Sequence, residues 1–379
     1  MGKLKTVGYE LRDVAVIQAP VSFCNHRSDV NPFIEVCKRD VYPIFVAPMA
    51  SVTDQNNYKT WIDNDLTPVI PRSVQRSGHN PDGLSFTDRI QLAKETFVSF
   101  SLKEVQEQLT TYFQQIEHTI VYYICIDIAH GTLSELYNVC KKLKECAGSC
   151  IQIMTGNVAN PSAYSFYADA GIDWMRAGIG GGSRCTSSAN VSIHFGMATL
   201  LDQLNEERKA YAHSHNGNAP TKIIADGGIG WFDDIQKALA LGADAVMCGK
   251  IFAECEEACE ETYYTGVKDG IFDLRNQWDV KREAEAYYEH SQYEVKKCRD
   301  YYGMSTKRAQ CITGGSGDRT SEGIDKPVEV KYPVAKWVDN MQSYLRSCMT
   351  YTNSHTIKEL RENAQVIILG GSGDAAYRK

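Results

Sequence analysis

Eight short apolar runs, each followed by a stretch with helical spacing, constrain the fold of this chain more than any other feature. The runs are rich in β-branched and aromatic residues, which is typical of strands buried on both faces of a parallel sheet. They occupy residues 43–49, 66–71, 95–100, 122–128, 150–156, 173–179, 222–228 and 245–249. Helical patterns follow them at residues 55–64, 84–93, 103–117, 134–147, 161–170, 193–209, 232–241 and 251–264.

This alternation predicts an α/β fold, and eight repeats favour a closed (β/α)8 TIM barrel. A doubly wound open sheet is the alternative, but its dinucleotide-binding fingerprint GxGxxG is not found after the first run. The length of 379 residues suits one barrel that carries insertions. We therefore expect a single domain over residues 1–379.

Three segments fall outside the repeats. Residues 265–300 are rich in Lys, Glu, Tyr and Asp and predict a charged, partly helical insertion after the eighth strand. Residues 306–322 include the Gly-rich stretch ITGGSGD and predict a mobile loop beside the active site. Residues 365–379 are expected to form a tail.

Composition excludes several classes of function. A net charge of -7 gives no overall basic field for nucleic acid, and no apolar run approaches the length needed to cross a membrane. The 13 cysteines are scattered without the spacing of a structural metal site. The start, MGKLKTVGYELRDV, lacks the apolar core of a signal peptide, so we expect reduced thiols in a cytoplasmic protein.

Polar and glycine-rich positions follow the predicted strands, at the end of a barrel where chemistry takes place. Asp127 and His130 follow the fourth strand, Asn157 the fifth, Asp226 the seventh, and Gly249 ends the eighth.

The loop AGIGGGSRCTSS, residues 177–188, follows the sixth strand. Its glycines allow backbone groups to face a phosphate or a monovalent cation. A flexible turn beside a buried, inert Cys185 is the alternative, but a thiol in a strand-end loop beside hydroxyl residues favours a nucleophile.

The segment GIGGGSRCT resembles the active-site loop GIGxGSxCT of the IMP dehydrogenase/GMP reductase family. Other family signatures occur in the same order, and together they cover roughly residues 10–360. They read LRDVAVI, HRSDVNP, FVAPMASVT, ICIDIAHG, GNV, IADGGI, VMCGK and YYGMS.

Three features resemble the GMP reductase branch. No room exists between the strand motifs for the accessory domain found in many IMP dehydrogenases. Only residues 306–321 separate GMxS from the later EG pair, which is too short for the dehydrogenase flap. RTSEG at 319–323 resembles the reductase motif RxSEG, and the tail LRSCMTYTNSHTIKEL is also similar to that of reductases.

The resemblance implies reductive deamination of GMP to IMP and ammonia. The Cys185 thiolate would attack C2 of GMP, Ser187 and Glu322 would pass a proton to the departing amine, and hydride from NADPH, or from NADH, would reach C2. The amine needs this proton because an unprotonated amine is a poor leaving group.

The resemblance also implies the binding residues. Asp226 would hold the ribose hydroxyls, and Asp127 would lie near the nicotinamide amide. The remaining nucleotide contacts would come from Ser183, Gly227, Gly228, Gly249, Lys250, Tyr302, Gly303, Met304, Ser305, Arg319 and Gly323. Further cofactor contacts would come from Arg72 and Ser321, and from Arg27 and Ser28 of a neighbouring subunit in a homotetramer. A potassium ion would be held by carbonyl groups of Gly180, Gly182 and Cys185.

Three departures from the family pattern keep other functions open. Ser187 stands where the family has Thr, Arg72 where reductases have Lys, and Lys250 where a small residue is usual. The alternatives are an NAD-dependent IMP dehydrogenase that forms XMP, a nucleotide-binding relative with reduced catalysis, and a reductase of a modified purine nucleotide. The dehydrogenase would use an Arg and a Tyr on its flap, and residues 318–320 lack the Tyr.

Cys185→Ala is expected to abolish turnover while binding of GMP or IMP survives. Binding relies on phosphate and ribose contacts, whereas the covalent step needs the thiolate. Steady-state rates and equilibrium nucleotide binding would be measured on both proteins. A variant that retains more than a few per cent of the rate would remove Cys185 from the nucleophile role.

Overall fold

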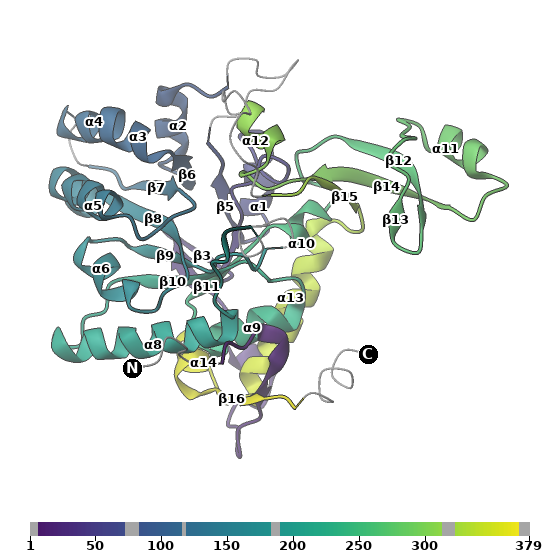
Figure 1. Cartoon of the computed structure of the whole chain (residues 1–379). Coiled ribbons are helices and arrows are strands. Elements are labelled where there is room, and N and C mark those ends of the chain that lie inside the picture. Colours follow the sequence, from purple (N-terminus) through teal and green to yellow (C-terminus); the bar gives the residue numbers. More distant parts are fainter. Residues whose placement is uncertain (1–6, 73–82, 116–118, 183–189, 313–322, 371–379) are drawn as a thin grey trace.

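The computed structural model describes residues 7–72, 83–115, 119–182, 190–312 and 323–370. Its centre is a closed barrel of eight parallel strands, with helices around the outside (Figure 1). The strands are β4 (Ile44–Val46), β5 (Thr67–Ile70), β6 (Phe97–Phe100), β7 (Tyr122–Asp127), β8 (Ile151–Val158), β9 (Trp174–Ala177), β10 (Lys222–Asp226) and β11 (Ala245–Cys248). The (β/α)8 prediction is confirmed, and the open sheet is excluded because β11 pairs with β4.

Helices on the outside connect successive strands. They are α1 (Tyr58–Ile62), α2 (Phe86–Leu92), α3 (Leu102–Glu104), the π-helical turn η3 (Val105–Leu109), α4 (Thr110–Gln115), α5 (Ser134–Ala147), α6 (Ala163–Asp169), α8 (Met197–Ser214) and α9 (Phe232–Ala240). Helix α5 shows why the sequence favours them. Its buried residues Leu136, Val139, Cys140, Leu143 and Ala147 recur at helical spacing on one face.

The interior of the barrel is a layer of large side chains from different strands. Trp174 is 1% exposed, and its ring centroid lies 5.1 Å from that of Phe45 in an edge-on arrangement. The amino end of the barrel is closed by the hairpin of β2 (Ile34–Val36) and β3 (Arg39–Val41), whose Val36 and Val41 pack in the same cluster. The amino end is therefore filled, and the open end is the carboxyl end.

The segment after β11 differs from the prediction. Helix α10 is one turn long (Lys250–Ala253), and the chain then forms strand β12 (Thr262–Lys268) instead of continuing as a helix to 264. The β-branched and aromatic residues of TYYTGVK favour a strand at this position.

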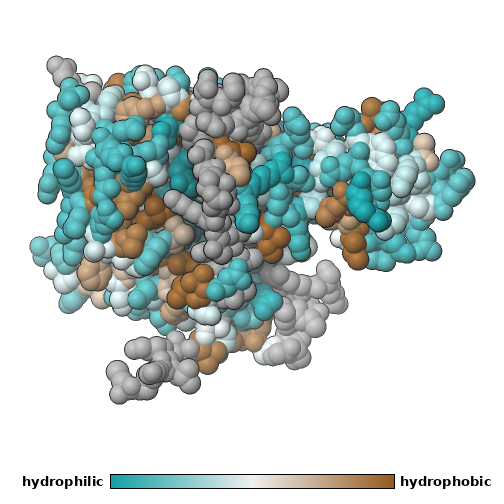
Figure 2. All heavy atoms as spheres, turned by 45° about the horizontal axis from the view of Figure 1, so that its top comes forward, coloured by the Kyte–Doolittle hydropathy of each residue, from teal (hydrophilic) through white to brown (hydrophobic). Residues whose placement is uncertain are grey.

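The insertion is organised by strands more than by helix. β12 pairs with β13 (Ile271–Phe272) and β14 (Glu294–Tyr301), and β14 pairs with β15 (Lys326–Glu329) to complete an antiparallel sheet. One helix, α11 (Lys281–Tyr288), packs on it. Figure 2 shows this part standing out from the barrel with a mostly hydrophilic surface and a few separate hydrophobic patches.

The remaining segments complete the outer layer. Residues 307–312 of the expected loop form helix α12 (Lys307–Ile312). Helix α13 (Val334–Tyr351) packs beside α9, with the ring of Trp337 stacked 5.4 Å from that of Phe232. After α14 (Ile357–Asn363), the expected tail begins as strand β16 (Gln365–Ile368), which pairs with β1 (Val14–Ile17). In the described part of the chain, no helix is both long and apolar enough to cross a membrane.

Trp174→Ala is expected to lower the free energy of unfolding by about 3–5 kcal/mol, because it leaves a large cavity in the barrel interior. Chemical denaturation would measure the change. Trp231→Ala is the matched control, because Trp231 is 63% exposed. The control should stay within about 0.5 kcal/mol of the wild type. Equal effects of the two substitutions would contradict the interior packing described here.

Candidate active site

A pocket of about 420 Å³ lies at the carboxyl end of the barrel. Its walls come from the segments that follow β4, β7, β8, β9, β10 and β11, and from residues 301 and 303–305 beyond the insertion. This volume suits one small-molecule ligand. A larger hollow of about 730 Å³ lies outside the barrel between β1, α9 and α13, and none of the predicted site residues lines it.

One arginine and two carboxylates form the charged floor of the pocket. Arg176 projects from β9, and its Nε lies 2.8 Å from Oδ2 of Asp226 while its Nη1 lies 2.9 Å from Oδ1 of Asp127. The three side chains are only 9%, 15% and 13% exposed, respectively. One positive charge therefore compensates two negative charges in a nearly dry environment.

The charge of Arg176 is secured by its partners. Burial alone would lower the pKa of Arg176, but the carboxylates of Asp226 and Asp127 raise it above its ordinary value. Arg176 thus stays charged near neutral pH despite its burial.

Asp226 presents one oxygen to the protein and one to the pocket. Its Oδ2 accepts hydrogen bonds from Arg176 and from the side-chain amide of Asn157, which lies 2.8 Å away. The same amide also donates to the carbonyl of Gly178 at 2.9 Å. Among the described residues, none donates a hydrogen bond to Oδ1 of Asp226, so this oxygen can accept from a ligand hydroxyl.

A second cation, which is not among the residues that line the pocket, approaches Asp127. Nε of Arg72, which follows β5, lies 3.8 Å from Oδ2 of Asp127. The predicted pair of Asp127 and Arg72 is therefore brought together, with Asp127 shared between Arg72 and Arg176.

Glycine backbone forms the other side of the pocket. Gly227 has φ +113, and a Cβ atom at Gly249 would lie 2.6 Å from the hydroxyl oxygen of Tyr301 and 2.8 Å from Sδ of Met49. A side chain at Gly249 would collide with the wall, and one at Gly227 would be strained. Gly180, Gly182 and Gly228 also line the pocket, where their backbone groups can face a ligand.

The predicted residues 302–305 divide between two environments. Gly303, Met304 and Ser305 line the pocket together with Tyr301. Tyr302 does not: it is 2% exposed, and its hydroxyl donates to Oε2 of Glu260 at 2.9 Å. Tyr302, predicted among the substrate-binding residues, is therefore not brought to this pocket, because its ring is buried against Glu260.

Other predicted residues lie at the rim or outside this pocket. Lys250 lines it, with Nζ 3.7 Å from Oε1 of Glu254. Arg27 and Ser28 lie on the exposed turn η2 (Arg27–Asp29), where Arg346 of α13 donates to the carbonyl of Arg27. Gly323 is described but does not line the pocket. Ser183, Cys185, Ser187, Arg319, Ser321 and Glu322 lie outside the described residues.

The two described cysteines in the strands next to the charged floor are not poised for chemistry. Burial raises the pKa of the Cys125 thiol to about 11, and it also raises the pKa of Cys248. Both remain protonated near neutral pH and are poor nucleophiles. Over the described ranges, no group of three His, Cys, Asp or Glu side chains could hold a metal ion.

Arg176 is the main site residue that the sequence prediction missed. It occurs as the one charged residue within the strand WMRA, whose four residues are all buried. A lone arginine in a buried strand needs an anionic partner, and this was the available signal.

The chain matches the family model described as IMP dehydrogenase / GMP reductase domain over residues 93–270 and 280–376. The gap at 271–279 lies within the insertion. Among curated proteins, the chain is similar to inosine-5'-monophosphate dehydrogenase of Chlorobaculum parvum, with 30% identity over 262 residues that cover 66% of this chain and 46% of that protein.

The enzymes of the same name from Methanocaldococcus jannaschii and Bacillus subtilis are also 30% identical. The alignments cover 66% of this chain in both cases, and 47% and 45% of those proteins, respectively. The chain therefore spans less than half the length of these relatives.

Arg176→Met is expected to lower the free energy of unfolding by about 3–5 kcal/mol, because it leaves two mostly buried carboxylates without their shared cation. Arg176→Lys should lose less, since Lys keeps the charge but cannot bridge two carboxylates as well. Arg12→Met is the control, because Arg12 is 64% exposed beside Asp13. If Arg176→Met were as stable in denaturant as Arg12→Met, the role given to this ion pair would be contradicted.

Proposed function

Because the chain belongs to the IMP dehydrogenase/GMP reductase family, we propose that it is a nicotinamide-dependent oxidoreductase acting at the purine base of a mononucleotide. The observation that carries the proposal is the pair of carboxylates, Asp127 and Asp226, held by Arg176 in a pocket at the carboxyl end of the barrel. Active sites of such barrels lie at this end.

The nucleotide has a complementary group for each of its parts. Oδ1 of Asp226 can accept from a ribose hydroxyl, as a carboxylate does for a vicinal diol. The backbone at Gly227, Gly228 and Gly249 suits a phosphate, because Gly227 and Gly228 have positive φ values that favour glycine and Gly249 has no side chain between its backbone and the pocket. Residues 303–305 form the wall left for the base.

The residues present also fit a nicotinamide beside the nucleotide. Asp127 lines the pocket and can accept from a carboxamide N–H, while the Arg72 guanidinium beside it can face an anionic group. When bound, the nicotinamide accepts or donates the hydride.

We assign the nucleophile to Cys185, as the family loop implies. In the oxidative direction, its thiolate would add to C2 of IMP, and a nicotinamide held beside Asp127 would supply the acceptor for the hydride on C2. Water then attacks C2 and releases the thiol, so that IMP, NAD⁺ and water give XMP, NADH and a proton. Arg176 fixes the orientation of Asp226, which would hold the ribose while C2 reacts.

The oxidation of IMP is the leading reaction, because the relatives described above are named IMP dehydrogenases. This reverses the preference drawn from the sequence motifs. Reduction of GMP with NADPH is the second candidate, and the motif RTSEG at 319–323 favours it. Both reactions use an IMP site, since IMP is the substrate of one and the product of the other.

Three further features remain part of the proposal. A homotetramer would bring Arg27 and Ser28 of one subunit to the cofactor of the next, since both lie outside their own pocket. Carbonyl groups of Gly180, Gly182 and Cys185 would hold a potassium ion. For the reductive reaction, NADH is the alternative to NADPH as the hydride donor.

The purified protein is expected to reduce NAD in the presence of IMP, with weaker or no oxidation of NADPH in the presence of GMP. The nicotinamide absorbance follows both reactions, and Cys185→Ala serves as the inactive control. If the protein turns over GMP with NADPH and does not turn over IMP with NAD, the reductase reaction would be established instead. Binding of IMP without either reaction would indicate a nucleotide-binding relative, and failure to bind IMP would overturn the proposal.

A further inference from the structure

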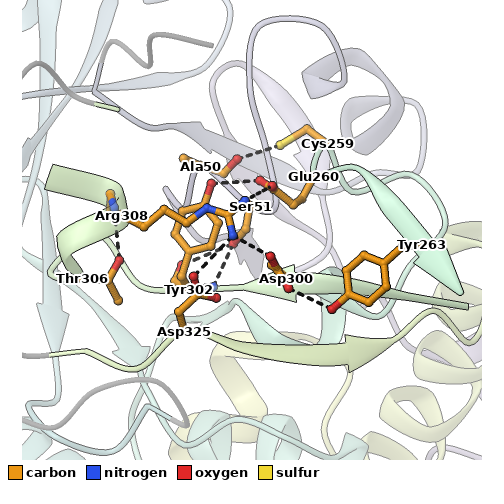
Figure 3. A network of polar contacts seen from close by, with 11 residues as sticks. Ala50, Ser51, Cys259, Glu260, Tyr263, Asp300, Tyr302, Thr306, Arg308 and Asp325 are labelled. Atoms are coloured by element: carbon orange, nitrogen blue, oxygen red, sulfur yellow. Dashed lines mark hydrogen bonds and ion pairs between the residues drawn. The ribbon is translucent and has the colours of Figure 1, made fainter. Parts of the chain in front are cut away.

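Figure 3 shows a cluster of charged and aromatic side chains around Tyr302, the residue between Tyr301 and Gly303 of the pocket wall. It consists of Glu260, Asp300, Tyr302, Arg308 and Asp325, and we call it the Arg308 cluster. Its members come from four separate stretches of the chain: the segment before β12, strand β14 with the loop that follows it, the start of α12, and the segment before β15.

Arg308 is the centre of this cluster. Its Nη2 lies 2.6 Å from Oε1 of Glu260, and its Nη1 lies 2.6 Å from Oδ2 of Asp300 and 3.3 Å from Oδ2 of Asp325. The guanidinium carbon also lies 4.6 Å from the ring centroid of Tyr302. One planar cation thus joins three carboxylates and covers one aromatic face.

Tyr302 connects the cluster to the pocket. Its hydroxyl donates to Glu260, the same residue that Arg308 binds. Its backbone N–H donates to Oγ of Ser51 at 3.4 Å, and Oγ of Ser51 donates to the Tyr302 carbonyl at 3.3 Å. Both chain neighbours of Tyr302 line the pocket, so the position of this ring fixes the position of the wall.

The cluster also links α12, which falls within the loop predicted at 306–322, to the segment just after that loop. Arg308 lies in α12, shortly before residue 313, and Asp325 lies shortly after residue 322. Asp300 is held in turn by the hydroxyl of Tyr263, which donates to its Oδ1 at 2.9 Å from strand β12. Strand β14 of the insertion is therefore connected, through the side chain of Arg308, to α12 and to the segment before β15.

Electrostatics makes Arg308 hard to replace. Burial would lower its pKa, but hydrogen bonding to Asp300 and the charge of Glu260 raise it above the ordinary value. Without this cation, three neighbouring carboxylates would repel one another, and Tyr302 would lose the contact over its ring.

We infer that Arg308 is a positioning residue of the nucleotide site. By binding the insertion through Asp300, Arg308 holds residues 303–305 in place at the pocket. The inference rests on the proposed function for the identity of the ligand. It gives the insertion a role in nucleotide affinity, although the insertion lies mostly beyond the barrel. It also gives Tyr302 a different role from Tyr301 and Gly303. These two residues line the pocket, whereas Tyr302 acts on the nucleotide only through them.

The test compares Arg308→Met with Lys307→Met, which removes one positive charge from the adjacent, exposed residue of the same helix. We expect the Arg308 variant to bind IMP about tenfold more weakly in calorimetry, with a smaller change in kcat than in the KM for IMP. Arg308→Lys should recover part of the affinity, because it restores the charge without the planar fork. Lys307→Met should match the wild type.

Hydrogen exchange of the protein without nucleotide gives a readout that does not depend on the proposed reaction. Backbone amides of residues 301–306 should exchange faster in Arg308→Met than in Lys307→Met, while the barrel strands exchange equally. If the wild type does not bind IMP, the proposed function fails and this exchange result alone decides the inference.

A second variant covers the case in which Arg308→Met does not fold. Tyr302→Phe removes only the hydroxyl that donates to Glu260, and it should also speed exchange at 301–306 and weaken IMP binding. The inference would be overturned if these amides exchanged in the folded Arg308→Met or Tyr302→Phe variant at the same rate as in Lys307→Met. It would also be overturned if the folded variant bound IMP within about twofold of the wild-type affinity.

Discussion

A single buried arginine allows two carboxylates to share the open end of this barrel. Asp127 and Asp226 come from strands on either side of Arg176. Without that cation, the mutual repulsion of the two carboxylates and the cost of removing them from water would oppose their positions in the folded barrel. The ion pair also fixes which oxygen of Asp226 faces inward and which faces a ligand. The geometry of the pocket around Asp127 and Asp226 therefore depends on Arg176, a residue in a strand interior.

The fold assigns support and recognition to different parts of the chain. Strand ends and glycine backbone supply most of the pocket, and these are held rigidly by the barrel ladder. The remaining wall, at 303–305, is not part of the ladder and depends on contacts behind it. An insertion that looks like an appendage in Figure 1 thus contacts the support of this wall through Asp300, which binds Arg308.

The barrel could be predicted from the sequence because parallel strands buried on both faces produce continuous apolar runs. The region after β11 could not, because a charged sequence such as that of α11 is compatible with helix anywhere, whereas β12 and β14 are stabilised by pairing with each other. Motif position located Asp127, Asp226 and Gly249 at the pocket. It could not show that Tyr302 faces away, because its partner Glu260 lies 42 residues earlier in the chain.

The pairing of β1 with β16 has a consequence for how the chain is made. Val14 pairs with Ile368, so this ribbon joins the beginning of the described chain to its end. During synthesis, β1 leaves the ribosome well before β16, because all eight barrel strands lie between them in the chain. Its edge stays open while the barrel is assembled, which exposes it to pairing with other nascent chains. Because contacts so distant in sequence form slowly, this seam closes late in the folding of the molecule.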